Sequence, residues 1–145
     1  MGVKRMEHVG IVVEDLPAAV GFFAALGMEE QGQGSADGEW VDRVIGLKGA
    51  DVEFAMMKTS DGAGQIELVR FNSPVHEGGV AEHPANVPGM RHLAFVVEDI
   101  EATIADLRAH GADVIGGPEN YSDIFLLAYV RGPAGMIVEL AEKIG

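Results

Sequence analysis

The chain has 145 residues, no cysteine and a formal net charge of −13, from 10 Lys+Arg against 23 Asp+Glu. This length suffices for one ordinary domain with a continuous core, and the absence of cysteine excludes disulfides and thiolate metal ligands. No basic run is present, which argues against nucleic acids and anionic membrane surfaces as partners. The apolar run after residues 1–6 is interrupted by Glu14 and Asp15 and is too short for a signal peptide or a membrane span. We therefore expect a soluble cytoplasmic protein.

An internal repeat organises the sequence. The segment HVGIVVEDL, from His8 to Leu16, recurs 92 − 8 = 84 positions later as HLAFVVEDI, from His92 to Ile100. A repeat of about half the chain predicts two related modules within one domain. It also implies that a role for the first histidine is shared by the second.

The first module opens with a strand and a helix. The run from Met6 to Val13 is apolar throughout and predicts a strand buried on both faces. Asp15 stands where a helix N-cap is expected, Pro17 fits the first turn, and Gly27 fits the residue after the helix end. The later expected segments are a polar, glycine-rich loop at 31–38, a segment at 39–47 open between strand and short helix, strands at 52–57 and 65–71, and a turn at 59–64.

The second module repeats this order. We expect a strand over 91–97, an N-cap at Asp99 and a helix that stops at Gly111. The later expected segments are residues 112–115, a turn at 116–118, and strands at 124–130 and 136–141. The expected domain covers residues 1–145, with module one at 5–71, a proline-containing linker at 72–89 and module two at 90–142.

Four ionisable residues occupy equivalent places in the two modules. His8 and His92 lie on the first strands, and Glu67 and Glu139 lie on the last ones. Taken singly, each reads as an ordinary strand residue, a core or edge histidine or a solvent-facing glutamate. If the two sheets curl into one open barrel, all four side chains converge on its concave face. Two neutral imidazoles and two carboxylates suit one divalent ion, such as zinc, nickel, cobalt, manganese or iron.

The two openings, the Ile66-Glu67-Leu68 strand and the closing segment from Arg131 to Leu140 resemble the vicinal oxygen chelate superfamily. That superfamily includes glyoxalase I, methylmalonyl-CoA epimerase, extradiol dioxygenases, and the fosfomycin and bleomycin resistance proteins. The resemblance implies an α+β fold of two tandem βαβββ modules, whose sheets pair into an open, cupped mixed β-barrel with helices outside. It also implies a divalent metal in the cleft and a homodimer.

The order of the four candidate ligands favours one branch of that superfamily. Glyoxalase I and the epimerase use His, Glu or Gln, His and Glu in that order, which resembles His8, Glu67, His92 and Glu139. We therefore expect a metal-dependent lyase or isomerase, in which the metal polarises a substrate carbonyl and Glu139 or Glu67 moves the adjacent proton. Extradiol dioxygenases use only one carboxylate, so Glu67 argues against them. A small-molecule binding protein of the bleomycin-resistance type remains the other alternative.

The substrate is less well indicated than the ligands. Arg70, Arg91 and Arg131 are weak candidates for substrate binding, and Glu53 is a weaker candidate for the proton-transferring group. Phe22-Phe23 replaces the Phe-Tyr usual in glyoxalase I, and no glutathione-binding set is recognisable. We therefore name neither a glutathione adduct nor a coenzyme A thioester as the substrate. The sequence also leaves open the metal's identity and whether one chain or two complete the cleft.

Overall fold

The computed structural model describes residues 2–145; Met1, where the expected domain begins, lies outside the described residues. The chain divides into two compact units, Met1–Gly79 and Val80–Gly145. The elements of the first unit are β1 (Val9–Val12), α1 (Leu16–Leu26), β2 (Glu29–Asp37), α2 (Glu39–Ile45), β3 (Asp51–Lys58) and β4 (Gln65–Ser73). Those of the second are β5 (His92–Val97), α3 (Ile100–Ala109), β6 (Asp113–Tyr121), β7 (Phe125–Arg131), η1 (Pro133–Gly135) and β8 (Ile137–Lys143).

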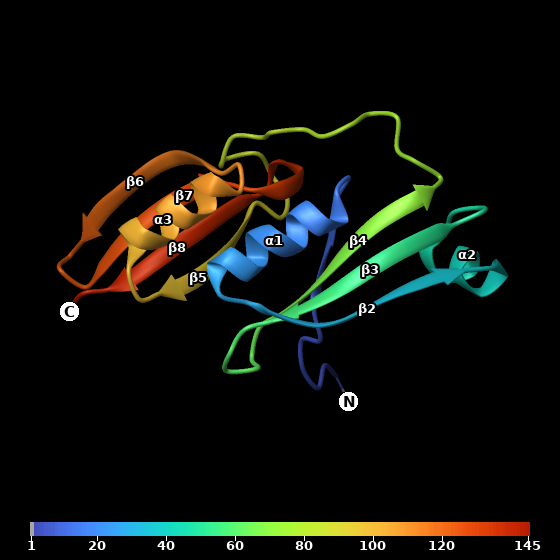
Figure 1. Ribbon diagram of the computed structural model, residues 1–145, viewed down its shortest axis with the longest axis horizontal. Helices are drawn as coiled ribbons and strands as arrows, with labels where there is room; N and C mark the ends of the chain where they lie inside the picture. Colours follow the sequence, from blue (N-terminus) through green and yellow to red (C-terminus); the bar gives the residue numbers. More distant parts are fainter. Residues whose placement is uncertain (1) are drawn as a thin grey trace. The chain divides into compact units, whose positions relative to one another are not determined.

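Each unit contains one four-stranded mixed sheet (Figure 1). The strand orders are β1-β4-β3-β2 and β5-β8-β7-β6, so the two sheets have the same topology and neither closes on itself. The predicted α+β class with two βαβββ modules is confirmed, with α2 as an addition in the first. That the whole chain forms one domain stays a prediction.

The last strand of each unit pairs with the first strand of that unit. β4 pairs with β1 in parallel, and β8 pairs with β5 in parallel, whereas the other pairs are antiparallel.

The histidines are 84 positions apart (92 − 8), but the glutamates are only 72 apart (139 − 67), a difference of 12 residues. Most of this difference falls at the α2 segment, which lies between β2 and β3 and has no counterpart among the described elements of the second unit.

The two long helices begin where the sequence predicted. Asp15 accepts a hydrogen bond from the Ala18 amide at 3.0 Å, and Asp99 accepts the equivalent bond from Ala102 at 2.9 Å. α1 ends at Gly27, whose φ of 108° is the left-handed conformation that glycine adopts without strain.

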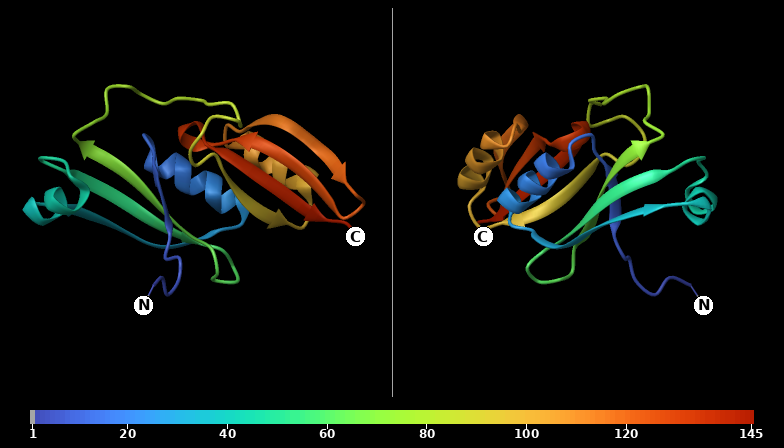
Figure 2. Two further views of the ribbon diagram at one scale, coloured as in Figure 1. Left: turned by 180° about the vertical axis from the view of Figure 1, so that it is seen from behind. Right: turned by 45° about the vertical axis from the view of Figure 1, so that its right-hand side comes forward.

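Each of these helices covers one face of its own sheet. α1 packs on β2, β3 and β4, and α3 packs on β6, β7 and β8. Figure 1 shows α3 in front of the second sheet, and Figure 2 (left) shows it behind, so the other face has no helix of that unit. Phe22 and Phe23 of α1 are fully buried with Leu68 of β4, and Leu107 of α3 is buried with Leu140 of β8. Within residues 2–145 no helix has the length and apolar character needed to span a bilayer.

Two expected loops are strands. All of the polar segment at 31–38 except Gly38 belongs to β2, and the expected turn at 116–118 lies within β6. Both are edge strands whose side chains are mostly exposed, so their sequences lack the apolar alternation of a half-buried strand. At Gly34 a Cβ would lie 2.6 Å from Cζ of Phe54, so glycine makes room for that ring. Register shifts on either side of Gly116 accommodate the Gly-Gly-Pro sequence.

The first strand is shorter and more exposed than expected. β1 begins at Val9, so His8 directly precedes it. Met6 is 81% exposed and Val12 is 57% exposed, which contradicts a strand buried on both faces from 6 to 13. The physical reason is that α1 covers only one face of this sheet. The ambiguous segment at 39–47 is resolved as the helix α2, which ends at Gly46.

Asp42 holds the loop that follows α2, and this predicts a pH-dependent contribution to stability. Its carboxylate accepts hydrogen bonds from the amides of Gly49 at 2.9 Å and Ala50 at 2.8 Å. These bonds, first the one from Ala50, lower the pKa of Asp42 below its ordinary value of 3.8. The stabilisation is therefore present above that value and is lost as the pH falls through the lower pKa of the folded state.

We expect Asp42→Asn to lower the melting temperature at neutral pH, and the difference from wild type to shrink in acid, as the pH falls below 3.8. Thermal unfolding followed by circular dichroism at both pH values measures this. Asp106→Asn, on the exposed side of α3, is the matched control. A melting-temperature difference that is the same at both pH values would contradict the proposed role of the Asp42 charge.

Candidate metal centre

The first half of the candidate site is a glutamate on β4 and the histidine that directly precedes β1, the strand parallel to β4. Nε2 of His8 lies 3.6 Å from Oε2 of Glu67, and the two side chains are 34% and 30% exposed. Glu67 lies opposite Gly10 in the β1/β4 register. Alternation along β4 puts Glu67 on the face opposite Ile66 and Leu68, which are buried on the α1 side. The pair therefore lies on the face that α1 leaves uncovered.

The second half of the candidate site repeats this arrangement. Nε2 of His92 lies 3.8 Å from Oε2 of Glu139, and the side chains are 40% and 24% exposed. Glu139 lies opposite Ala94 in the β5/β8 register, and Ala94 is the counterpart of Gly10 at a shift of 84. In both units the glutamate thus faces the residue two positions after the histidine. The repeat in the sequence becomes a repeat of side-chain placement.

The structure joins the four predicted ligands in two pairs, His8 with Glu67 and His92 with Glu139. Among residues 2–145, neither unit by itself gathers three His, Asp or Glu side chains into a group that could hold an ion. Each pair supplies one imidazole and one carboxylate, and both side chains are half-exposed.

The donor set of the two pairs fits a divalent cation. Two neutral imidazoles and two carboxylates balance a charge of +2, and such nitrogen and oxygen ligands suit zinc and the neighbouring transition metals. All four side chains are partly exposed. That one ion is held by all four stays a prediction.

Tyr129 is a polar neighbour of the second pair that sequence reasoning missed. It lies opposite Glu139 in the β7/β8 register, and its hydroxyl is 3.5 Å from Nδ1 of His92. The signal available in the sequence was a tyrosine within an apolar strand, but its partner depends on the strand register.

Two of the three candidate arginines have other partners. Arg70 lies on the sheet face opposite Glu67 and forms an ion pair with Glu53 at 3.7 Å, so Glu53 is also on that opposite face. Arg131 donates from Nη1 to the carbonyls of His83 and Gly135, at 2.9 and 3.0 Å. Arg91 directly precedes His92, and its Nε is buried without a hydrogen-bond partner within the described residues. Arg91 stays a prediction as a substrate contact.

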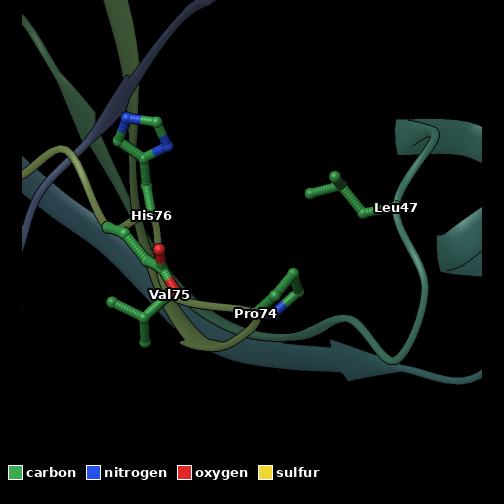
Figure 3. A pocket seen from close by; sticks show the side chains of 5 residues that line it. Leu47, Pro74, Val75 and His76 are labelled. Atoms are coloured by element: carbon green, nitrogen blue, oxygen red, sulfur yellow. The ribbon is translucent and has the colours of Figure 1, made fainter.

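A pocket of about 450 Å³ lies elsewhere in the first unit, and Figure 3 shows it. None of the four predicted ligands lines it, so it is separate from the His–Glu pairs. Leu47 reaches toward it from the loop after α2 (Figure 3). Its lining residues are Leu47, Pro74, Val75, His76 and Glu77.

Solved structures show the fold independently. A glyoxalase family protein from Bacillus cereus is 39% identical, with a TM-score of 0.91 over 100% of this chain and 97% of that one. A variant of the fosfomycin resistance protein FosX from Listeria monocytogenes, solved with Mn(II) and a dihydroxypropylphosphonic acid, is 13% identical, with a TM-score of 0.61 over 96% of this chain and 90% of that one. At that identity the likeness to FosX concerns the fold alone.

Sequence comparisons identify the family. A Mycobacterium tuberculosis protein provisionally named glyoxylase CFP32 is 30% identical over 102 residues, which are 70% of this chain and only 36% of that protein. The uncharacterised Bacillus subtilis protein YwbC is 27% identical over 97% of this chain and 98% of its own length. A family profile matches residues 7–128, which include His8, Glu67 and His92 and end before Glu139. The chain therefore belongs to the glyoxalase/bleomycin resistance protein/dioxygenase superfamily.

Proposed function

We propose that this chain is a divalent-metal-dependent lyase or isomerase of the glyoxalase and epimerase type. The observation that carries the proposal is the same His–Glu pair in both units, at the same register between the first and last strands. Stability alone does not require this repetition, because both pairs are half-exposed and pairs of that kind stabilise a fold by about 1 kcal/mol or less.

The four ligands in the proposal are His8, Glu67, His92 and Glu139. A divalent ion bound by them would act as a Lewis acid toward a carbonyl oxygen of the substrate. The metal's identity is open among zinc, nickel, cobalt, manganese and iron, since the donor set suits each of them.

The carboxylates are the proposed proton carriers. A general base has to lie within hydrogen-bond reach of the proton that it takes, so the glutamate that carries the proton would have to release the ion to reach the carbon beside the carbonyl. Glu139 and Glu67 are equivalent in the repeat, so either could take this role. Glu53 is excluded from this role because it lies on the opposite sheet face, in an ion pair with Arg70.

The charges around the pairs bear on the class of substrate. Arg70 lies on the other face of its sheet, and Arg131 is engaged by two backbone carbonyls. Of the three candidate arginines this leaves Arg91, and one cation is too few for the several phosphates of coenzyme A. We propose a small carbonyl compound and name neither a glutathione adduct nor an acyl-CoA.

A homodimer is part of the proposal. Each unit supplies half of the donor set, and a complete set arises either from the two pairs of one chain or from pairs of two chains. Mixing two ligand-deficient variants would distinguish these cases, because His8→Ala and His92→Ala chains could complement each other only across an interface.

Proton exchange tests the proposed reaction type. In deuterium oxide, the protein loaded with zinc or nickel should introduce deuterium beside the carbonyl of a true substrate, and mass spectrometry would detect the added mass. A panel of 2-oxo compounds and acyl thioesters covers the classes considered. Tight binding of a panel compound without any deuterium incorporation would instead support a sequestering protein.

A further inference from the structure

The two histidines of the candidate site differ in one contact. Nδ1 of His92 lies 3.5 Å from the Tyr129 hydroxyl, and the centroids of the two rings are 5.2 Å apart with 40° between their planes. The other ring nitrogen, Nε2, faces Glu139 at 3.8 Å. The two nitrogens of His92 thus have different neighbours, a hydroxyl on one side and a candidate metal ligand on the other.

The corresponding place in the first unit holds a thioether instead of a hydroxyl. Met56 lies opposite Glu67 in the β3/β4 register, which is the place that Tyr129 takes opposite Glu139. A thioether is a weak acceptor and has no proton to donate, whereas a phenol hydroxyl both donates and accepts. The equivalence of the two pairs therefore ends at this position.

We propose that Tyr129 is a positioning residue for His92, an inference that rests on the proposed metal site. A neutral imidazole that binds a metal through one nitrogen carries its proton on the other, and a hydrogen bond to that N–H fixes both the tautomer and the ring orientation. With the Tyr129 oxygen accepting from Nδ1–H, the Nε2 lone pair on the Glu139 side would be available to bind an ion. The tyrosine keeps its own O–H, which is free to donate elsewhere.

We expect the metal affinity to fall when Tyr129 is replaced, and not when Met56 is replaced. Tyr129→Phe keeps the ring and removes the acceptor, so the Kd for Zn²⁺ should rise about 10- to 100-fold, the usual cost of losing a partner of a ligating histidine. Tyr129→Met, which copies the first unit, should have the same effect. Met56→Leu is the matched control and should leave the Kd within about 2-fold. The Met56 thioether has no proton to donate and is only a weak acceptor, so it does not fix a histidine by a hydrogen bond as the Tyr129 hydroxyl does.

The experiment titrates Zn²⁺ into the metal-free full chain against a chromophoric chelator, at one fixed pH. Folding of each variant is checked by circular dichroism, and Tyr129→Met serves if Tyr129→Phe does not fold. The second readout is the ¹H–¹⁵N spectrum of the histidine side chains in the zinc-loaded protein. Wild type should show a slowly exchanging Nδ1–H at His92, and this signal should exchange faster or disappear in Tyr129→Phe.

The outcomes separate this inference from the proposed function. If wild type takes up zinc, and Tyr129→Phe has the same Kd and the same His92 spectrum, the positioning role is wrong and the metal site stands. If wild type takes up none of zinc, nickel, cobalt, manganese and iron, the proposed metal site is wrong and the role of Tyr129 falls with it. Weaker binding together with a changed His92 signal supports the proposal.

Discussion

Replacement of His92 by alanine is expected to weaken Zn²⁺ binding by more than about 100-fold, because loss of a ligand costs at least as much as loss of a residue that orients one. The same loss is expected for His8→Ala. Each variant removes one of two imidazoles from the proposed donor set and leaves its glutamate without the imidazole nitrogen that lies beside it. Equilibrium dialysis followed by elemental analysis gives both the affinity and the number of ions bound.

Two histidines outside the pairs provide matched controls. His76 lies in the first unit and His83 in the second, and both side chains are exposed. His76→Ala and His83→Ala should bind zinc as wild type does. Should either His8→Ala or His92→Ala keep full affinity, that histidine is not a ligand and the four-residue site is wrong.

The second large effect is expected at the carboxylates. Glu139→Gln, assayed at saturating zinc or nickel, should slow deuterium incorporation into a true substrate by about 10²- to 10⁴-fold if Glu139 is the proton carrier, which is the usual contribution of a general base. An amide has nearly the same shape as a carboxylate but cannot take up the proton. Glu67→Gln decides between the two equivalent residues, because only one of them should show the full effect.

Glu53→Gln is the control for this comparison. Glu53 lies in the same unit as Glu67 but on the opposite sheet face, where it pairs with Arg70. Its replacement should leave the exchange rate unchanged. Exchange rates within about 3-fold of wild type in both Glu139→Gln and Glu67→Gln would show that neither carboxylate carries the proton, since general-base effects are larger than that.

Local signals in the sequence predicted the parts of the fold that local chemistry determines. Asp15 and Asp99 cap their helices because a carboxylate accepts the free amides of the first turn, and this depends only on neighbouring residues. The edge strands β2 and β6 were missed because their strand state comes from pairing with β3 and β7. Gly34 illustrates this, since it pairs with Phe54 of β3, whose ring leaves no room for a Cβ there.

The candidate site was predictable as far as the repeat extends. The repeat identified His8 and His92, and the apolar strands around Glu67 and Glu139 identified the glutamates. Tyr129 escaped because its relation to His92 depends on the register of β7, β8 and β5 together. The face of Arg70 could have been inferred, because residues an odd number of positions apart on a strand point to opposite faces, and Arg70 is three positions from Glu67.

The coordination of bound zinc tests the central claim most directly. X-ray absorption spectroscopy of the zinc-loaded protein, at one ion per complete donor set, reports how many imidazoles surround each ion. The shared site predicts two imidazole nitrogens per zinc at about 2.0–2.1 Å, with carboxylate oxygens completing the shell. One imidazole per zinc, together with two ions per chain, would show that each His–Glu pair binds separately and would contradict the four-ligand centre.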